Sequence, residues 1–148
     1  MAWLAIGLGM TVIGYDPYPS KDFNPTGFEL TTFEDVISRA DVISLHCPPE
    51  DEPLLNEAAI LTMKAGAYVV NTARAELIDN AAFLKALESG HLSGLATDVF
   101  QEEPPALNDL LAHDRVTLTP HAGGFTEESV TRATEIAVAN LLKVLEPA

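Results

Sequence analysis

The chain has 148 residues, the size of one ordinary domain, and its 47% hydrophobic and 20% charged residues exclude a disordered chain. The formal net charge is −14, so the chain would repel the phosphates of nucleic acids and the headgroups of anionic lipids. No apolar run approaches the roughly 20 residues that a transmembrane helix needs, and we expect neither a nucleic-acid partner nor a membrane partner.

The first half of the sequence alternates helical and strand-like segments. In chain order we predict the end of a helix at 1–8, strands at 10–15 and 27–30, a helix at 31–40, a strand at 41–45 and a helix at 56–63. The helix at 31–40 opens on a capping-box pattern, in which Thr31 is followed three residues later by Glu34. Gly9 would stop the first helix.

The second half continues this alternation. We predict a strand at 67–71, a helix at 80–89 closed by Gly90, strands at 92–99 and 116–119, and a long helix at 127–145. The long helix has an apolar stripe that runs from Val130 to Val144. Strands and helices that alternate at this spacing predict right-handed crossovers and a parallel sheet, so the fold class is α/β.

Polar residues directly follow four of the predicted strands. They are Asp16, the segment 46–48, the segment 71–74 and the stretch from Asp98 to His121. Ligand sites of parallel sheets lie where the carboxyl ends of the strands meet their loops. This coincidence of polar clusters with strand ends is the main indication of function in the residues themselves.

Gly7 and Gly9 look like the start of a phosphate-binding glycine motif. The next glycine, Gly14, comes too late for the G-x-G-x-x-G spacing, and no strand precedes the pair. A dinucleotide-binding motif needs a strand, a tight turn and the start of a helix in that order. We therefore reject these glycines as a phosphate-binding loop.

Asp16 and Arg74 each allow two interpretations. An acidic residue at the end of the second strand of a nucleotide-binding fold binds the adenosine ribose and favours NAD over NADP, but an aspartate before a proline is also common in turns. Arg74 is a natural bidentate partner for a substrate carboxylate. The alternative for Arg74 is a surface salt bridge with Glu76 or Asp79.

Glu103 and His121 are a candidate proton-transfer pair. A glutamate beside a histidine stabilises the charged imidazolium and fixes the ring, which makes a general acid/base near neutral pH. The alternative is that they are separate loop residues, because Glu103 is as easily solvated as Glu102. The histidines and the single cysteine, Cys47, lack the spacing of metal ligands, so no metal site is predicted.

Five ordered segments carry a resemblance to a known family of enzymes. They are GMTVIGYDPY, ADVISLHCPP, MKAGAYVVNTARAELID, ALESGHLSGLATDVFQEEPP and VTLTPHAGGFTEES. Together they resemble the D-isomer-specific 2-hydroxyacid dehydrogenases over almost the whole chain. The resemblance implies an oxidoreductase that transfers a hydride between NAD and a D-2-hydroxyacid/2-oxoacid pair, with a small-molecule substrate, a homodimeric state and a cytoplasmic location.

The resemblance also implies a role for individual residues. Arg74 would bind the substrate's carboxylate and carbonyl oxygen, His121 would take the hydroxyl proton, and Glu103 would pair with His121. The residues implied to contact the cofactor are Asp16, Cys47, Pro48, Thr72, Ala73, Asp98 and Gly123. Ala75 departs from the family's usual glycine after the arginine.

The resemblance further implies a Rossmann-like, doubly wound parallel sheet that is truncated at its N-terminus. We expect one NAD-binding domain over residues 1–148, without the family's first strand and glycine-rich loop, and with its terminal helix, about 127–146, packing towards a substrate domain. Without that strand the sheet would have unpaired edges and bare apolar surface. The truncation keeps two alternatives open, a non-catalytic binding or corepressor-like module and an inactive fragment.

Overall fold

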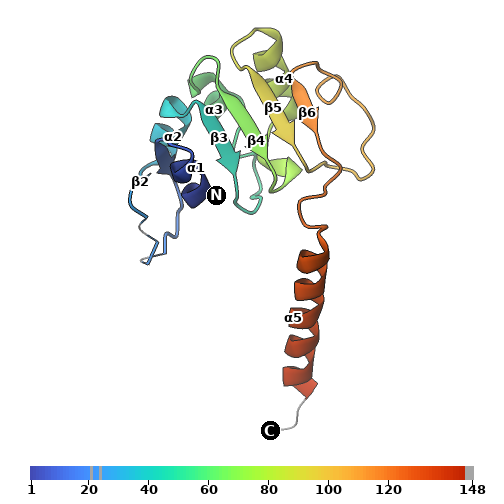
Figure 1. The fold of residues 1–148 in the computed structure, drawn as a ribbon. Coiled ribbons are helices and arrows are strands. Elements are labelled where there is room, and N and C mark those ends of the chain that lie inside the picture. The colour runs from blue at the N-terminus through green and yellow to red at the C-terminus, as the bar shows by residue number, and fades with distance from the viewer. Residues whose placement is uncertain (21, 24, 146–148) are drawn as a thin grey trace.

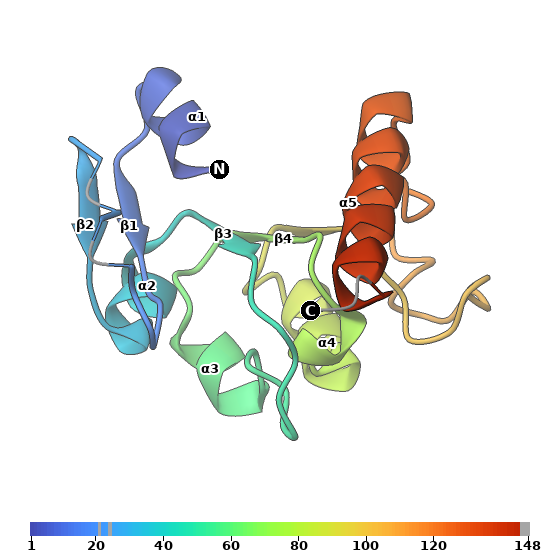
Figure 2. The ribbon, with the colours of Figure 1, turned by 90° about the horizontal axis from the view of Figure 1, so that it is seen from below.

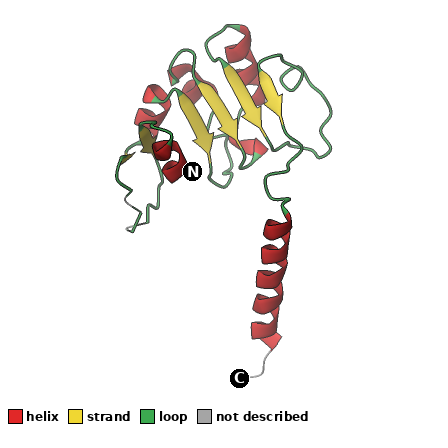
Figure 3. Cartoon of the chain, in the orientation of Figure 1, coloured by secondary structure: helices red, strands yellow, loops and turns green. Residues whose placement is uncertain are grey.

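Strands and helices alternate along the chain, and all the strand pairs of the described part are parallel, as the sequence predicted (Figures 1 and 3). The structure is a computed structural model that describes residues 1–20, 22–23 and 25–145. Its elements are α1 (Ala2–Gly7), β1 (Val12–Gly14), β2 (Phe28–Leu30), α2 (Phe33–Arg39), β3 (Val42–Leu45), α3 (Glu57–Thr62), β4 (Tyr68–Asn71), the 3-10 helix η1 (Ala75–Leu77), α4 (Asn80–Glu88), β5 (Gly94–Thr97), β6 (Val116–Leu118) and α5 (Glu127–Leu145).

The strands form two separate parallel sheets. One has the order β1-β2 and the other the order β3-β4-β5-β6. β1 and β3 are not hydrogen-bonded to each other, so each of them has an unpaired edge. The fold is the predicted α/β arrangement, with its strands in two sheets that share no hydrogen-bonded pair.

The four-stranded sheet packs its buried face on helices α3 and α4. Alternate strand residues point to this face, among them Ile43, Leu45 and Val69, which are at most 5% exposed. Phe83 and Leu87 of α4 are fully buried against the same core. Figure 2 shows α3 and α4 together on one side of β3 and β4. The core therefore fixes the positions of β3, β4 and β5, from which the candidate site residues project.

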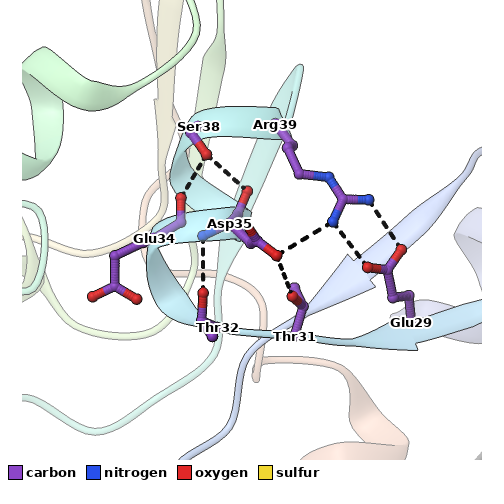
Figure 4. Close-up of polar contacts among 7 residues, drawn as sticks. All are labelled: Glu29, Thr31, Thr32, Glu34, Asp35, Ser38 and Arg39. Carbon is purple, nitrogen blue, oxygen red and sulfur yellow. Dashed lines mark hydrogen bonds and ion pairs between the residues drawn. The ribbon is translucent and has the colours of Figure 1, made fainter.

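Helix α2 begins one residue later than the capping-box pattern predicted. Thr32 is the N-cap, and its hydroxyl accepts a hydrogen bond from the backbone N–H of Asp35 (Figure 4). The Thr31 hydroxyl instead donates to the Asp35 carboxylate at 2.6 Å. The prediction of Thr31 with Glu34 was wrong because two threonines stand side by side, and either could supply the cap. At its other end, Arg39 forms two hydrogen bonds to Glu29 of β2.

Several strands are shorter than predicted. The expected strand at 92–99 is β5, Gly94–Thr97, and the expected strand at 10–15 is β1, Val12–Gly14. Apolar character continues beyond the residues that have a hydrogen-bonded neighbour, and only those residues belong to a ladder. Gly9 follows α1 with φ of 80°, as expected for the residue that stops a helix.

Helix α5 projects away from the two sheets (Figure 1). None of its residues is buried, and Leu141 is 58% and Val144 81% exposed on the predicted apolar stripe. Residue 146, at the end of the expected helix range, lies outside the described residues. No helix in the described part of the chain is both long and apolar enough to cross a membrane.

Candidate functional site

The carboxyl ends of β3, β4, β5 and β6 form one edge of the larger sheet. The register aligns Leu45 with Asn71, Asn71 with Thr97, and Thr97 with Leu118. The next residue of each strand therefore leaves the sheet at the same level; these residues are His46, Thr72, Asp98 and Thr119. Two further backbone hydrogen bonds tie these ends together, from Asp98 N to the Asn71 carbonyl and from Thr119 N to the Thr97 carbonyl. Loops from this edge carry the candidate catalytic residues.

Glu103 and His121 are in direct contact. His121 Nδ1 lies 2.7 Å from Glu103 Oε1, and each side chain is 44% exposed. The carboxylate accepts the hydrogen bond, so Nδ1 carries the proton, a tautomer that we assign from this geometry. Nε2 makes no hydrogen bond to any residue that the structure describes. The alternative of two separate loop residues does not describe this arrangement.

Asp98 organises the turn that carries His121. Its Oδ1 accepts hydrogen bonds from the Thr119 hydroxyl at 2.5 Å and from Ala122 N at 3.0 Å, and its Oδ2 accepts one from Gly123 N at 3.0 Å. These bonds use three of the roughly four acceptor positions of a carboxylate. The Thr119 hydroxyl, followed by the Gly123 amide, holds the pKa of Asp98 below its usual value, so the group is ionised near neutral pH.

His121 has a backbone conformation that residues other than glycine rarely adopt. Its φ is 52°, the only positive value at a non-glycine residue in the described segments. The left-handed region costs an ordinary residue roughly 1–2 kcal/mol. The backbone bonds of the neighbouring Ala122 and Gly123 to Asp98 offset that cost.

Arg74 is exposed and has no carboxylate partner. Among the described residues no Asp or Glu oxygen lies within 4.0 Å of its guanidinium group, and the predicted surface pairs with Glu76 or Asp79 are absent. Its Nη1 donates to the carbonyl of Ala73 at 2.6 Å. No hydrogen bond joins Arg74 to Glu103 or His121. The guanidinium is therefore available for an anion from outside the chain.

Asn71 positions the Arg74 loop, a function that the sequence interpretation missed. This side chain is 1% exposed, its amide donates to the Arg74 carbonyl at 2.8 Å, and its oxygen accepts from Ala73 N at 3.1 Å. A buried polar group needs such partners. The sequence offered one indication of this function, because Asn71 is a polar residue at the end of the apolar run AYVV. From the sequence, Asn71 is identified only as part of the polar segment 71–74.

Cofactor contacts were also implied for residues 47, 48, 72, 73 and 123, which lie at the same edge of the larger sheet in different environments. Pro48 and Thr72 are exposed, whereas Cys47 and Ala73 are half-buried against the core. Burial raises the pKa of the Cys47 thiol, which keeps it protonated and unreactive. The backbone N–H groups of Ala73 and Gly123 are already used, by Asn71 and Asp98 respectively.

Asp16 lies apart from this group, at the end of β1 in the smaller sheet. Its Oδ1 accepts a hydrogen bond from Tyr18 N at 2.8 Å, the turn arrangement that was one of its two interpretations. The side chain is exposed, and its Oδ2 makes no hydrogen bond to the described residues. The turn therefore leaves one carboxylate oxygen available for a ligand.

His46 closes β3 but has a local role. Its Nε2 lies 2.9 Å from the Ser44 hydroxyl, and burial lowers its pKa, so the ring is neutral near pH 7. Among the residues that the structure describes, no group of three or more His, Cys, Asp or Glu side chains is arranged to hold a metal ion.

The family model and curated relatives that this chain matches are named D-2-hydroxyacid or D-3-phosphoglycerate dehydrogenases, or their NAD-binding domain. Residues 1–123 match the family model described as "D-isomer specific 2-hydroxyacid dehydrogenase, NAD binding domain". The chain is 43% identical over 146 residues to D-3-phosphoglycerate dehydrogenase 2, chloroplastic, of Arabidopsis thaliana; the match covers 94% of this chain and 23% of the plant protein.

Solved structures show the same similarity. A D-lactate dehydrogenase from Aquifex aeolicus, complexed with NAD and lactic acid, superposes with a TM-score of 0.85 at 31% identity and covers 97% of this chain. A glyoxylate reductase from Paecilomyes thermophila gives a TM-score of 0.90 at 31% identity and covers 98%. The chain spans 49% and 45% of these two proteins, respectively.

Proposed function

Because the chain belongs to the D-isomer specific 2-hydroxyacid dehydrogenase family, through its NAD-binding domain, we propose that it takes part in reversible oxidation of a D-2-hydroxyacid to a 2-oxoacid with NAD. The observation that carries this proposal is the contact of His121 Nδ1 with Glu103 at the edge of the sheet where the Arg74 guanidinium has no carboxylate partner among the described residues. One anion-binding group and one oriented proton acceptor are the side-chain chemistry that such a reaction needs.

Arg74 binds and orients the substrate in this proposal. A guanidinium group matches a carboxylate with two parallel hydrogen bonds, and its charge also polarises a neighbouring carbonyl oxygen. The buried Asn71 amide fixes the position of the Arg74 loop through its bonds to the Arg74 carbonyl and Ala73 N. Since the chain is otherwise strongly acidic, an anionic substrate needs this local cation.

His121 moves the proton. With Nδ1 bonded to Glu103, Nε2 is the nitrogen that accepts the proton of the substrate hydroxyl during oxidation and returns it to the oxoacid during reduction. Glu103 holds the ring in this orientation and stabilises the imidazolium that forms.

Six residues are proposed to hold the cofactor: Asp16, Cys47, Pro48, Thr72, Ala73 and Gly123. When bound, NAD supplies the ring that exchanges a hydride with the substrate carbon. The free oxygen of Asp16 fits the adenosine ribose hydroxyls, and its charge opposes the extra phosphate of NADP. The half-buried Cys47 and Ala73 fit contact with the cofactor through their apolar surface.

We also propose that one further parallel strand, followed by a glycine-rich turn, completes the sheet between β1 and β3. The order β2-β1 followed by β3-β4-β5-β6 (Figure 2) supports this proposal, because the doubly wound strand order 3-2-1-4-5-6 has its first strand at that place. The completed sheet would then have seven strands, with β6 as the last. The exposed apolar stripe of α5 supports packing towards a substrate domain. A cytoplasmic homodimer completes the proposal, and light scattering on the purified protein would measure its mass.

Turnover tests the proposal. The full protein should oxidise NADH with at least one member of a panel of 2-oxoacids, and His121→Gln should reduce kcat by roughly 10²–10⁴-fold. His113→Gln is the matched control, because His113 lies away from the sheet edge and bonds Arg115 N. Arg74→Ala should mainly raise KM for the oxoacid. NADH binding without turnover in any pair would identify a non-catalytic module instead.

A further inference from the structure

Asp98 was expected to contact the cofactor, but most of its bonding capacity is used inside the chain. Asp98 is 6% exposed, and its carboxylate accepts hydrogen bonds from the Thr119 hydroxyl, Ala122 N and Gly123 N. All three donors lie in the 119–123 turn, and His121 is at the centre of that turn. The carboxylate is thus surrounded by the backbone that carries the proton-transfer group.

We infer that Asp98 is a positioning residue, which holds the 119–123 turn in the shape that directs the His121 ring to Glu103. The turn has few other supports. Beyond the Asp98 bonds, His121 N bonds the Thr119 carbonyl, Thr119 N bonds the Thr97 carbonyl, Phe125 N bonds the Ala122 carbonyl and the His121 ring bonds Glu103. The positive φ of His121 would relax to a commoner value if Ala122 and Gly123 were released, and the side chain would then leave the carboxylate.

Gly123 shows how closely the turn fits the Asp98 carboxylate. A Cβ atom on Gly123 would lie 3.0 Å from Asp98 Oδ2, closer than ordinary van der Waals contact, whereas a Cβ atom on the adjacent Gly124 would have nothing within 4 Å. The two glycines are therefore different in kind. Gly123 is required for the approach of its own N–H to the carboxylate, and Gly124 is not.

This inference rests on the proposed function for the meaning of His121, but its test does not require turnover. The readout is the tautomer of neutral His121, from the ¹⁵N shifts of its ring nitrogens above the titration range, assigned with His121→Gln. Contact with Glu103 favours the Nδ1–H form, whereas an unconstrained neutral histidine prefers Nε2–H. Glu103→Ala defines the signal of a ring that has lost its acceptor for Nδ1–H, whereas a glutamine oxygen could still accept that bond.

Asp98→Asn should shift His121 towards the Glu103→Ala signal and remove the exchange protection of the Gly123 amide, because the side-chain amide nitrogen cannot accept the hydrogen bond that Oδ2 accepts. Its control is Asp35→Asn, which changes another carboxylate that accepts a threonine hydroxyl, from Thr31 (Figure 4), and should leave His121 unchanged. Thr119→Val removes one donor without touching the carboxylate, and Thr117→Val on β6 is its control. Gly123→Ala should act like Thr119→Val, and Gly124→Ala should have no effect.

The outcomes separate positioning from direct contact with a ligand. A changed tautomer in Thr119→Val and Gly123→Ala supports the inference even if Asp98→Asn does not fold. A wild-type tautomer in all three variants overturns it, and so does an Asp98→Asn protein that loses dinucleotide binding while His121 keeps its Nδ1–H form. A protein that neither binds nor turns over NADH, yet shows the tautomer change, contradicts the proposed function and leaves the positioning of His121 intact.

Discussion

The two sheets differ in how far they are supported by the rest of the chain. We define the four-stranded half as residues 33–123 and the two-stranded half as residues 1–32. The buried core runs from Ile37 to Leu110, entirely within the four-stranded half. The two-stranded half has no residue in that core, and α1 has no buried residue. Most of the packing energy therefore stabilises one half.

The candidate site is divided in the same way. Arg74, Glu103, His121 and their positioning residues lie on the four-stranded half, whereas Asp16 lies on the two-stranded half. The proton-transfer geometry thus depends on a packed core, and the proposed ribose contact depends on a weakly supported sheet. The halves are joined mainly through α2, by Arg39 with Glu29 and by the tilted rings of Tyr15 and Phe33 at 5.9 Å.

A matched pair of leucines should show the largest difference between the halves. Leu87 of α4 is 1% exposed and Leu4 of α1 is 69% exposed. Leu87→Ala should lower the free energy of unfolding by about 2–5 kcal/mol, because it removes buried contacts and leaves a cavity. Leu4→Ala should change it by no more than about 0.5 kcal/mol. Urea denaturation measures both, and equal losses would contradict the division of the molecule into two unequal halves.

Removing a helix cap in each half should give a smaller difference in unfolding free energy. Asp79 caps α4 by accepting from Ala81 N and Ala82 N, at 3.0 and 3.1 Å, whereas Thr32 caps α2 through one bond of 3.2 Å where the halves meet. Asp79→Ala should cost about 1–2 kcal/mol of unfolding free energy and Thr32→Ala about 0.5–1 kcal/mol. Thermal unfolding of the two variants checks the order, and the reverse order would show that the junction is more tightly coupled than we propose.

We expect the smallest difference between the two halves in how their stability depends on acid pH. Hydrogen bonds hold the pKa of Asp98 and of Glu29 below their usual values, from Thr119 to Asp98 and from Arg39 to Glu29. A lowered folded-state pKa stabilises the fold above the unfolded-state pKa, about 3.9 for Asp and 4.3 for Glu, and this stabilisation is lost as the pH falls through the folded-state value. Unfolding midpoints measured across acid pH should therefore depend less on pH in Asp98→Asn and in Glu29→Gln.

Salt distinguishes these two carboxylates. Glu29 and Arg39 are both about half exposed, so added salt should weaken the Glu29 contribution. Asp98 bonds uncharged donors and should respond little. Equal salt sensitivity in the two variants would go against their assignment to different environments.

The order of strands and helices could be predicted from the sequence because apolar runs and turn residues alternate regularly. The starts of α3 and α4 could also be predicted, because each has a single capping residue, Asn56 and Asp79 respectively. The start of α2 was not, since Thr31 and Thr32 are equivalent as sequence signals. The bounds of the strands depend on hydrogen-bonded neighbours, which a local pattern does not contain.

The site residues could be located at strand ends, but their contacts could not be derived. Glu103 and His121 are 18 residues apart and meet only because the turn after β6 returns over the loop after β5. The use of the Asp98 carboxylate by the 119–123 turn has no sequence signature, since it depends on a positive φ at His121. The buried role of Asn71 depends likewise on the fold of the Arg74 loop.

The proposed cofactor site is best tested by titration calorimetry of NADH and NADPH binding to the full chain. We expect saturable binding of NADH that is tighter than that of NADPH, and a smaller difference between them in Asp16→Ala, because the charge at the end of β1 opposes the extra phosphate. Binding in the micromolar range corresponds to roughly 8 kcal/mol. A folded chain that binds neither dinucleotide, or binds NADPH as well as NADH, would contradict the proposed site.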